Sequence, residues 1–326
     1  MEISRPGDNL EQIIIDTINQ AQVSIDVAIQ ELNLPLIADA LVAKHQDEVA
    51  VRVIVENQYR SAFSDLGVAE VAGLAERDRH KYNEFLQLVD LNRDGQVQAI
   101  EALQRDAIRI LEAAKIPLID DTEDGSKGSG LMHHKFLVID GQTSLMGSAN
   151  FTVSGIHGDF SHPESVGNAN HVAVIQNEAI AQELTTEFEL MWGDGPGGQP
   201  NSQFGLQKPY RPPTTIQMAP DSNVTLYFSP ISDARYSWEE SGNGLIGQTL
   251  NTAQSSLDLA LFVFSDQSLS RILQQQSDRD RTIRALIDAE FIYRPYSEAL
   301  DMMGVSYPNQ HETFHCQWHS AGVQEQ

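Results

Sequence analysis

The chain has 326 residues, of which 41% are hydrophobic, so it is long enough for two domains or two fused repeats with buried cores. Its formal net charge of −25 argues against broad, non-specific attraction to DNA or to an anionic membrane, because such binding relies on Lys and Arg to release counterions from phosphates. A single cysteine, Cys316, excludes an intrachain disulfide framework.

The sequence carries no visible export or membrane signal. No apolar run is long enough to span a bilayer. The first residues, MEISRPGDN, have neither the basic region nor the apolar region of a signal peptide. We therefore expect a cytoplasmic protein, or a fragment whose natural start is missing.

Helices and strands alternate at the start of the chain, which is typical of an α/β sheet. The apolar pattern predicts helix, strand, helix and strand over residues 9–21, 23–32, 34–44 and 49–55. Glu31 and Glu56 fall at the C-terminal ends of the two strands, where α/β proteins tend to place their sites. Both are candidate substrate-binding residues in the wall of a pocket, although solvated strand ends carry the same residue types.

A charged helical stretch, residues 77–111, interrupts this alternation. Its centre matches the calcium-loop pattern D-x-[DN]-x-[DN]-G-x5-E at each position and resembles an EF-hand. Oxygens at loop positions one, three, five, seven and twelve can wrap a hard cation. The predicted Ca²⁺ ligands are Asp90, Asn92, Asp94, Gln96 and Glu101. A polar helix–turn–helix without metal is the alternative, since EF-hands usually work in pairs and only one is visible.

The stretch from residue 132 to residue 152, MHHKFLVIDGQTSLMGSANFT, predicts a β-hairpin with polar groups gathered at one end. His133 and Lys135 are two apart, so on a strand their side chains share a face, and His134 points to the other. Asp140-Gly141 is a hairpin turn signal. The return strand then brings Gly147 and its neighbours to the same end as the histidine.

These residue types suit the cleavage of a phosphodiester. A neutral imidazole can act as nucleophile or acid/base, and a lysine ammonium can hold a phosphoryl oxygen. Asp140 offers a carboxylate that can support an imidazole. Ser148 and Asn150 add hydrogen bonds beside a glycine, Gly147, that lets the backbone approach closely. A structural hairpin with a hydrogen-bonded histidine is the simpler alternative.

The pattern His-x-Lys-x4-Asp, followed after six residues by Gly-Ser-x-Asn, resembles the signature of the phospholipase D superfamily. Here it is carried without gaps by His133, Lys135, Asp140, Gly147, Ser148 and Asn150. The resemblance implies an α/β fold of two repeats, each a mixed β-sheet flanked by helices, with the EF-hand-like insertion in the first. It also implies a covalent phosphohistidine, and chemistry that needs no metal or other cofactor.

The rest of the chain supports two repeats. Residues 1–192 form the first repeat, and residues 193–223, rich in Gly, Pro, Gln and Ser, form a linker. Residues 224–326 start the pattern again with a strand at 224–228. The run SLDLAL from Ser256 then echoes SIDVAI from Ser24.

The chain departs from the family pattern in two places. Asn168-Ala169-Asn170 stands where the family commonly has Asn-x-Glu, so an amide replaces a carboxylate. Residues 224–326 contain no His-x-Lys, whereas the family site uses two such motifs. The chain is truncated before a second motif, or two copies pair their motifs as a homodimer, or the second repeat is degenerate and the protein inactive.

Four residues near the C-terminus have metal-binding side chains at close spacing: His311, His315, Cys316 and His319. The spacing matches no common zinc-finger pattern, and a strand or loop that happens to hold histidines explains it more simply.

The leading interpretation is a phosphodiesterase acting on a phospholipid or a nucleic acid, with phospholipid favoured by the acidic composition. An endonuclease of the same superfamily and an inactive calcium-binding scaffold are the alternatives. Whether calcium is structural or regulatory stays open.

Overall fold

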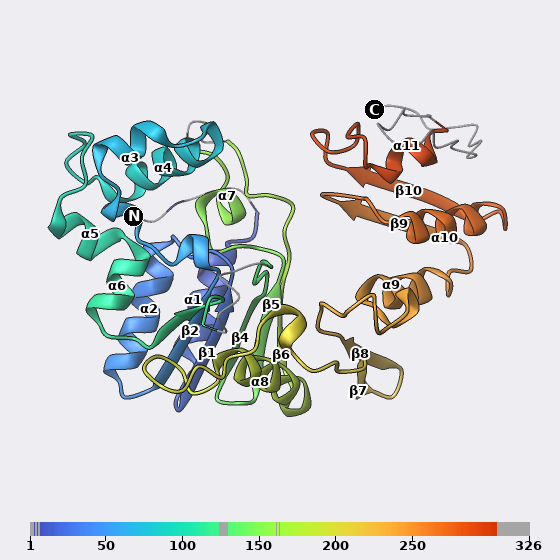
Figure 1. The fold of residues 1–326 in the computed structure, drawn as a ribbon, viewed down its shortest axis with the longest axis horizontal. Coiled ribbons are helices and arrows are strands. Elements are labelled where there is room, and N and C mark those ends of the chain that lie inside the picture. Colours follow the sequence, from blue (N-terminus) through green and yellow to red (C-terminus); the bar gives the residue numbers. More distant parts are fainter. Residues whose placement is uncertain are drawn as a thin grey trace. The chain divides into compact units, whose positions relative to one another are not determined.

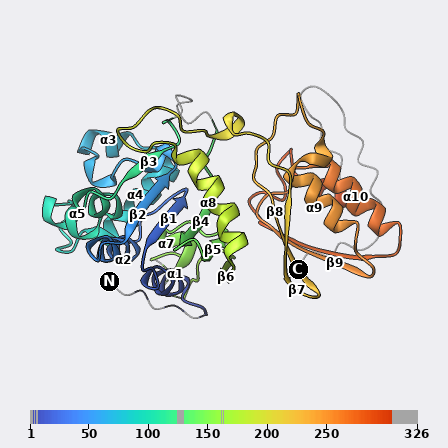
Figure 2. The same cartoon turned by 90° about the horizontal axis from the view of Figure 1, so that it is seen from below.

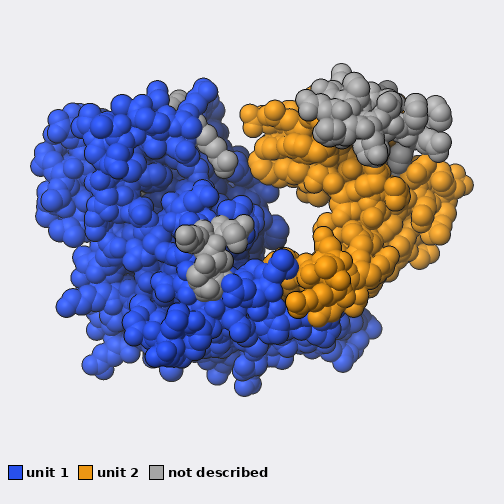
Figure 3. Space-filling view, in the orientation of Figure 1, with its two compact units in different colours: residues 1–226 blue, residues 227–326 orange. Residues whose placement is uncertain are grey.

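The computed structural model describes residues 3, 5, 7–123, 130–160, 162 and 164–304. The chain falls into two compact units, Met1–Leu226 and Tyr227–Gln326, which Figure 3 shows in different colours. The first unit contains the histidine hairpin and the insertion, so its sheet and helices position the candidate site. The histidines and cysteine at 311–319 lie outside the described residues.

A six-stranded sheet forms the centre of the first unit, with strand order β3-β2-β1-β4-β5-β6. The first three strands run parallel to one another, and each of the other three runs antiparallel to its neighbours. The mixed sheet predicted for the first repeat is therefore confirmed. The strands are β1 (Ser24–Ile29), β2 (Ala50–Val55), β3 (Leu118–Asp120), β4 (Lys135–Ile139), β5 (Thr143–Gly147) and β6 (Val172–Gln176).

Helices cover both faces of this sheet (Figures 1 and 2). One face carries α1, α2 and α6, and the other carries the long helix α8, which contacts β1, β4 and β5. The helices are α1 (Leu10–Asn19), α2 (Pro35–Gln46), α6 (Ala107–Ala113), α7 (Val153–Ile156) and α8 (Glu178–Trp192). No helix in the described ranges is long and apolar enough to cross a bilayer.

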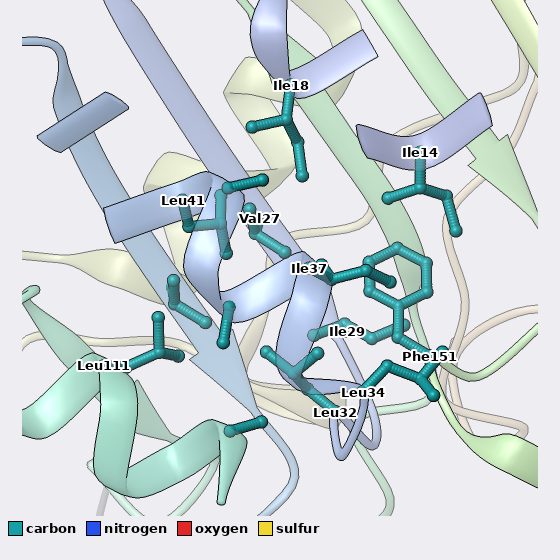
Figure 4. Packing of buried hydrophobic residues seen from close by; sticks show 14 of the residues in the cluster. Ile14, Ile18, Val27, Ile29, Leu32, Leu34, Ile37, Leu41, Leu111 and Phe151 are labelled. Atoms are coloured by element: carbon teal, nitrogen blue, oxygen red, sulfur yellow. The ribbon is translucent and has the colours of Figure 1, made fainter. Parts of the chain in front are cut away.

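The hydrophobic core lies between the sheet and the helices α1, α2 and α6 (Figure 4). Ile14 of α1, Leu41 of α2 and Val27 of β1 are almost fully buried there. Each side chain of this size contributes roughly 1.5–3 kcal/mol when it leaves water. Phe151 belongs to the same core and is 1% exposed. Because Phe151 directly follows Asn150, core packing also fixes the end of the predicted motif.

The segment between β2 and β3 differs most from the predicted boundaries. The insertion begins directly after β2, not at residue 77. It contains η1 (Asn57–Tyr59), η2 (Phe63–Asp65), α3 (Val68–Gly73), α4 (Glu76–Val89) and α5 (Ala99–Arg105). The helical stretch that was predicted to continue to residue 111 breaks at Asp106. The carboxylate of Asp106 accepts hydrogen bonds from the backbone N–H groups of Ile108 and Ser64, so it caps a new helix, α6.

The predicted linker, residues 193–223, contains structure of its own. It includes η3 (Gly205–Gln207) and β7 (Thr214–Ala219), and β7 pairs with β8 (Ser222–Leu226) in a separate hairpin. The strand predicted at 224–228 therefore pairs with the preceding segment and does not open the sheet of the second repeat.

The second unit contains one parallel strand pair, β9–β10, within the residues described. The mixed sheet predicted for the second repeat is not present among them. The elements are η4 (Trp238–Glu240), α9 (Gly242–Leu250), β9 (Ser256–Leu261), α10 (Gln267–Ser277), β10 (Thr282–Ile287) and α11 (Glu298–Met302).

The same ion pair occurs in both units at matching positions. Asp26 of β1 faces Arg52 of β2 at 2.7 Å, and Asp258 of β9 faces Arg284 of β10 at 2.6 Å. The internal repeat predicted from SIDVAI and SLDLAL therefore extends to strand register. The surroundings differ, because aromatic rings of α8 lie over the first guanidinium, whereas the side chain of Arg284 is 73% exposed.

Candidate active site

Strand direction brings the predicted site residues to one edge of the first sheet. β4 runs antiparallel to β1, so the start of β4 lies beside the end of β1. β5 ends and β6 begins at the same edge. The structure therefore gathers there Glu31, Glu56, His133, Lys135, Gly147, Ser148 and Asn150. These predicted residues thus lie at one edge of the sheet, with His133 just before β4 and not within it.

Lys135 is the most tightly held of these residues. Its Nζ donates to Oε1 of Gln30 at 3.0 Å and to the carbonyl oxygen of His133 at 2.9 Å. Asn150 donates to the same Gln30 oxygen at 3.2 Å. Burial lowers the pKa of Lys135 to about 8, and the nearby carboxylate of Glu31 opposes this shift. Within the described residues Lys135 forms no direct ion pair, so its charge can be offered to an anionic ligand.

His133 keeps an exposed face at this edge. Desolvation of its ring lowers the pKa of His133, and the positive charge of Lys135 and then that of His134 lower it further. At neutral pH the imidazole is therefore neutral and able to act as a nucleophile. His134 points to the opposite face, where its Nε2 lies 3.1 Å from Oε1 of Glu187 on α8. The side chain of His134 thus contacts α8, whereas that of His133 is exposed at the sheet edge.

Ser148 joins the ends of β5 and β6. Its Oγ donates to Oδ1 of Asn170 at 2.9 Å and lies 3.3 Å from Nδ1 of His171. Gly147 is required beside it, because a Cβ at that position would lie 2.2 Å from the carbonyl oxygen of His171. The amide Asn170, which stands where the family commonly has a carboxylate, therefore touches the predicted serine directly.

Glu31 and Glu56 contact other protein groups. Glu31 forms an ion pair of 2.7 Å with Lys81 on α4. Glu56 has no exposed surface, and its Oε2 accepts from the backbone N–H of Gln58 at 3.0 Å. Burial raises the pKa of Glu56, opposed by that hydrogen bond. In this structure Glu56 supports the edge from within and does not line its surface, which corrects the predicted pocket wall.

Asp140 lies at the far end of β4 from His133, so the structure does not bring it to the imidazole. Its carboxylate accepts from the backbone N–H groups of Gln22, Val23 and Ser24 at 2.7–2.9 Å. Burial raises the pKa of Asp140, but these three donors outweigh it and hold the pKa below its usual value. Asp140 therefore ties the turn after β4 to the start of β1, which corrects its predicted catalytic role.

The predicted calcium loop joins α4 to α5 at the expected positions. Gly95, at loop position six, has φ +81°, and its N–H donates to Asp90 at 2.8 Å. Glu101 folds back, and its Oε1 accepts from the N–H of Asn92 at 3.1 Å, while Asp94 accepts from the N–H of Gln96 at 2.8 Å. Within the described residues, no three His, Cys, Asp or Glu side chains are grouped so as to hold a metal ion. The calcium site stays a prediction.

Three supporting residues were not predicted from the sequence. Gln30 accepts from both Lys135 and Asn150, and its position directly after a buried strand was the available signal. Asp121 accepts from the N–H of Met132 at 3.2 Å and so fixes the backbone beside His133. Lys81 gave no signal, because it reaches the edge from the insertion.

A family model described as "Cardiolipin synthase, PLD-like domain" matches residues 14–192, more than half of the chain, including the whole histidine motif. The chain belongs to the phospholipase D-like phosphodiesterase family. The mitochondrial cardiolipin hydrolases of Xenopus laevis and Xenopus tropicalis are 25% identical to it over 173 and 174 residues. These matches cover 53% of this phospholipase D-like chain and 56% of each relative, so it spans a little over half of their length.

Two solved structures are distant likenesses of this chain. The phospholipase D family member Nuc from Salmonella typhimurium is 18% identical, with a TM-score of 0.35 over 57% of this chain and 88% of Nuc. Phosphatidylserine synthase from Haemophilus influenzae is 11% identical, with a TM-score of 0.49 over 90% of this chain and 64% of the synthase. At these values neither structure carries an argument about activity or substrate.

Asp140→Ala is expected to weaken the fold, because three backbone N–H groups lose their acceptor and a residue at φ +53° loses a side chain suited to that conformation. The contacts are partly solvent-exposed, so we expect the free energy of unfolding to fall by about 1–2 kcal/mol. Asp140→Asn, which keeps one acceptor oxygen, should lose less. Urea denaturation measures both, and an alanine variant as stable as the wild type would contradict the anchoring role.

Proposed function

We propose that the chain is a phosphodiester hydrolase of the phospholipase D type. The observation that carries the proposal is the pairing, at one sheet edge, of a neutral imidazole with a lysine ammonium held by an uncharged amide. The imidazole of His133 supplies a nucleophile, and Lys135 supplies positive charge for the non-bridging oxygens of a phosphodiester. Asn150 and Ser148 add hydrogen bonds at the same edge.

In the proposed reaction a nitrogen of His133 attacks phosphorus, a P–N bond forms, and the bond from phosphorus to the leaving alcohol oxygen breaks. That oxygen takes a proton from a general acid. Water then attacks phosphorus and gives a proton to the group that served as the general acid, the P–N bond breaks, and His133 is regenerated. The family scheme assigns the acid role to the histidine of a second His-x-Lys motif. A second copy of this chain could supply it, so a homodimer forms part of this proposal.

We favour a phospholipid as the substrate. Both relatives named above are cardiolipin hydrolases, and the net charge of −25 disfavours a broad nucleic-acid surface. Cleavage of single-stranded DNA, as by an endonuclease of the same superfamily, is the second candidate. A catalytically inactive calcium-binding scaffold is the third, because residues 224–326 contain no second motif.

A covalent adduct on His133 tests the proposal. Incubation with cardiolipin or phosphatidylcholine and an alkaline quench should leave a phosphorus adduct on His133, detectable by peptide mass spectrometry. His133→Ala should abolish the adduct and lower turnover by at least about 10³-fold. His134→Ala is the matched control, since that side chain faces α8, and it should retain the adduct.

Absence of an adduct and of turnover, with the protein folded, would favour the scaffold. Turnover of single-stranded DNA without turnover of lipid would replace the substrate class while leaving the chemistry intact. Light scattering on the assayed sample would show whether activity coincides with a dimer.

The pH dependence of kcat/KM should be bell-shaped. Activity should rise with pH through a value below 6.5, as His133 loses its proton and becomes nucleophilic. It should fall as pH rises through about 8, because Lys135 then loses its charge. Steady-state assays from pH 5 to pH 10 measure both limbs. Lys135→Arg, whose guanidinium does not titrate in this range, should retain the acid limb and lose the alkaline one.

We also propose that the loop from Asp90 to Glu101 binds one calcium ion outside the site of chemistry. In support, α4 ends and α5 begins at the positions that an EF-hand requires, and Gly95 makes the turn at position six. Asp90, Asn92, Asp94, the carbonyl of Gln96 and Glu101 would supply the oxygens.

Isothermal titration should detect one calcium site in the wild-type chain. Removing both terminal carboxylates, by Asp90→Ala with Glu101→Ala, should abolish the heat of binding. Glu76→Ala, on α4 but outside the loop, should leave the heat of calcium binding unchanged. Unaltered calcium binding by the double variant would refute the assignment.

A further inference from the structure

The insertion reaches the active-site edge through one lysine. Nζ of Lys81, on α4, lies 2.7 Å from Oε2 of Glu31 and 3.0 Å from the hydroxyl of Tyr59. The same ammonium lies over the Tyr59 ring, 4.3 Å from its centroid. The side chain of Glu31 is only 6% exposed and that of Lys81 only 20%. This is therefore a largely buried pair, held from two directions.

Glu31 is also part of the frame that holds the site. It directly follows Gln30, whose Oε1 accepts from both Lys135 and Asn150. Its carbonyl oxygen accepts from the N–H of Phe151 at 3.0 Å. Its carboxylate lies close enough to Lys135 to raise the pKa of that lysine against the effect of burial. Two lysines, from α4 and from β4, thus interact with one buried carboxylate.

Of these two lysines, Lys81 alone forms a direct ion pair with Glu31, and this leaves the ammonium of Lys135 available to a ligand. A buried carboxylate that lost Lys81 would be left with an uncompensated charge, and Lys135 is the nearby cation that could compensate it. A lysine drawn onto a carboxylate is less available to a phosphoryl oxygen. Two further groups interact electrostatically with Glu31, namely Glu84 on the helix of Lys81 and Glu56 after β2, and both are acidic and cannot take the place of Lys81.

We propose that Lys81 is a positioning residue, carried by the insertion, that occupies the carboxylate of Glu31 and so leaves the ammonium of Lys135 available for the substrate phosphate. The consequence for catalysis rests on the proposed function, whereas the coupling between the three charges does not. The insertion therefore contributes to the site through Lys81.

The coupling is tested without any activity by labelling Lys135 with acetic anhydride across pH and quantifying the peptide by mass spectrometry. Lys81→Met should shift the onset of labelling upward by about one pH unit, because the unpaired carboxylate raises the pKa of Lys135. Glu31→Gln should shift the onset downward, because the carboxylate that supports the charged form is gone. Lys81→Arg should behave as the wild type.

Arg79→Met is the matched control, since it removes a cation from the same helix whose guanidinium contacts the carbonyl groups of Ala72 and Leu74. It should leave the onset unchanged. Shifts of opposite sign in Lys81→Met and Glu31→Gln support the proposal. An unchanged onset in whichever of the two variants folds overturns it, as does an equal shift in Arg79→Met. Circular dichroism establishes folding.

The kinetic consequence is measured on the same variants. Lys81→Met should raise KM for the phosphodiester about tenfold with a smaller change in kcat, and Lys81→Arg should restore it. Altered labelling with unaltered KM would confine the coupling to electrostatics and overturn the positioning role. A wild-type chain with no turnover would refute the proposed function, while the labelling result would still judge the coupling.

Discussion

The antiparallel pairing of β4 with β1 is the constraint on which the site depends. In a sheet of parallel strands alone, the ends of β1 and β2 would meet only the ends of other strands. Because β4 runs the opposite way, its first residues lie beside the last residues of β1, and Lys135 meets Gln30 there. The end of β5 and the start of β6 complete the same edge. A reversed or shifted β4 would disperse the imidazole, the ammonium and the amides.

That edge holds a charge in surroundings that disfavour it. Lys135 is largely buried, and its hydrogen-bond acceptors are an amide oxygen and a backbone carbonyl, so its ammonium is hydrogen-bonded but not neutralised. Such an arrangement is costly in a folded protein and useful in a site that must attract a phosphate. The carboxylate of Glu31 would remove much of this cost if it bound Lys135, but it binds Lys81. The availability of the Lys135 ammonium thus depends on Lys81, which lies 50 residues from Glu31 in the chain.

Sequence patterns predicted what depends on neighbours along the chain. Spacing placed His133 and Lys135 on one face and His134 on the other, and the Asp-Gly turn placed Gly147 beside them. The contacts of Asp140 were not predictable in this way, since its partners start a strand more than one hundred residues earlier and only the sheet brings them together. The break at Asp106 was missed although its N-cap is local: Oδ1 accepts from the N–H groups of Ile108 and Arg109, and Oδ2 accepts from the N–H of Ser64, 42 residues earlier. Helical periodicity does not report such contacts, and it continued through the break.

The ion pair shared by the two units shows how their parallel strands correspond. Asp and Arg face each other in both because the two parallel pairs share one alignment, since a slip of one residue would set isoleucine, valine or leucine against the guanidinium. The first pair lies under aromatic rings and the second is open to water. The two pairs therefore differ in their contribution to stability, although they occupy matching positions. The pair is thus a position at which the two parallel strand pairs correspond residue for residue, and it gives a fixed point for superposing one strand pair of this chain on the other.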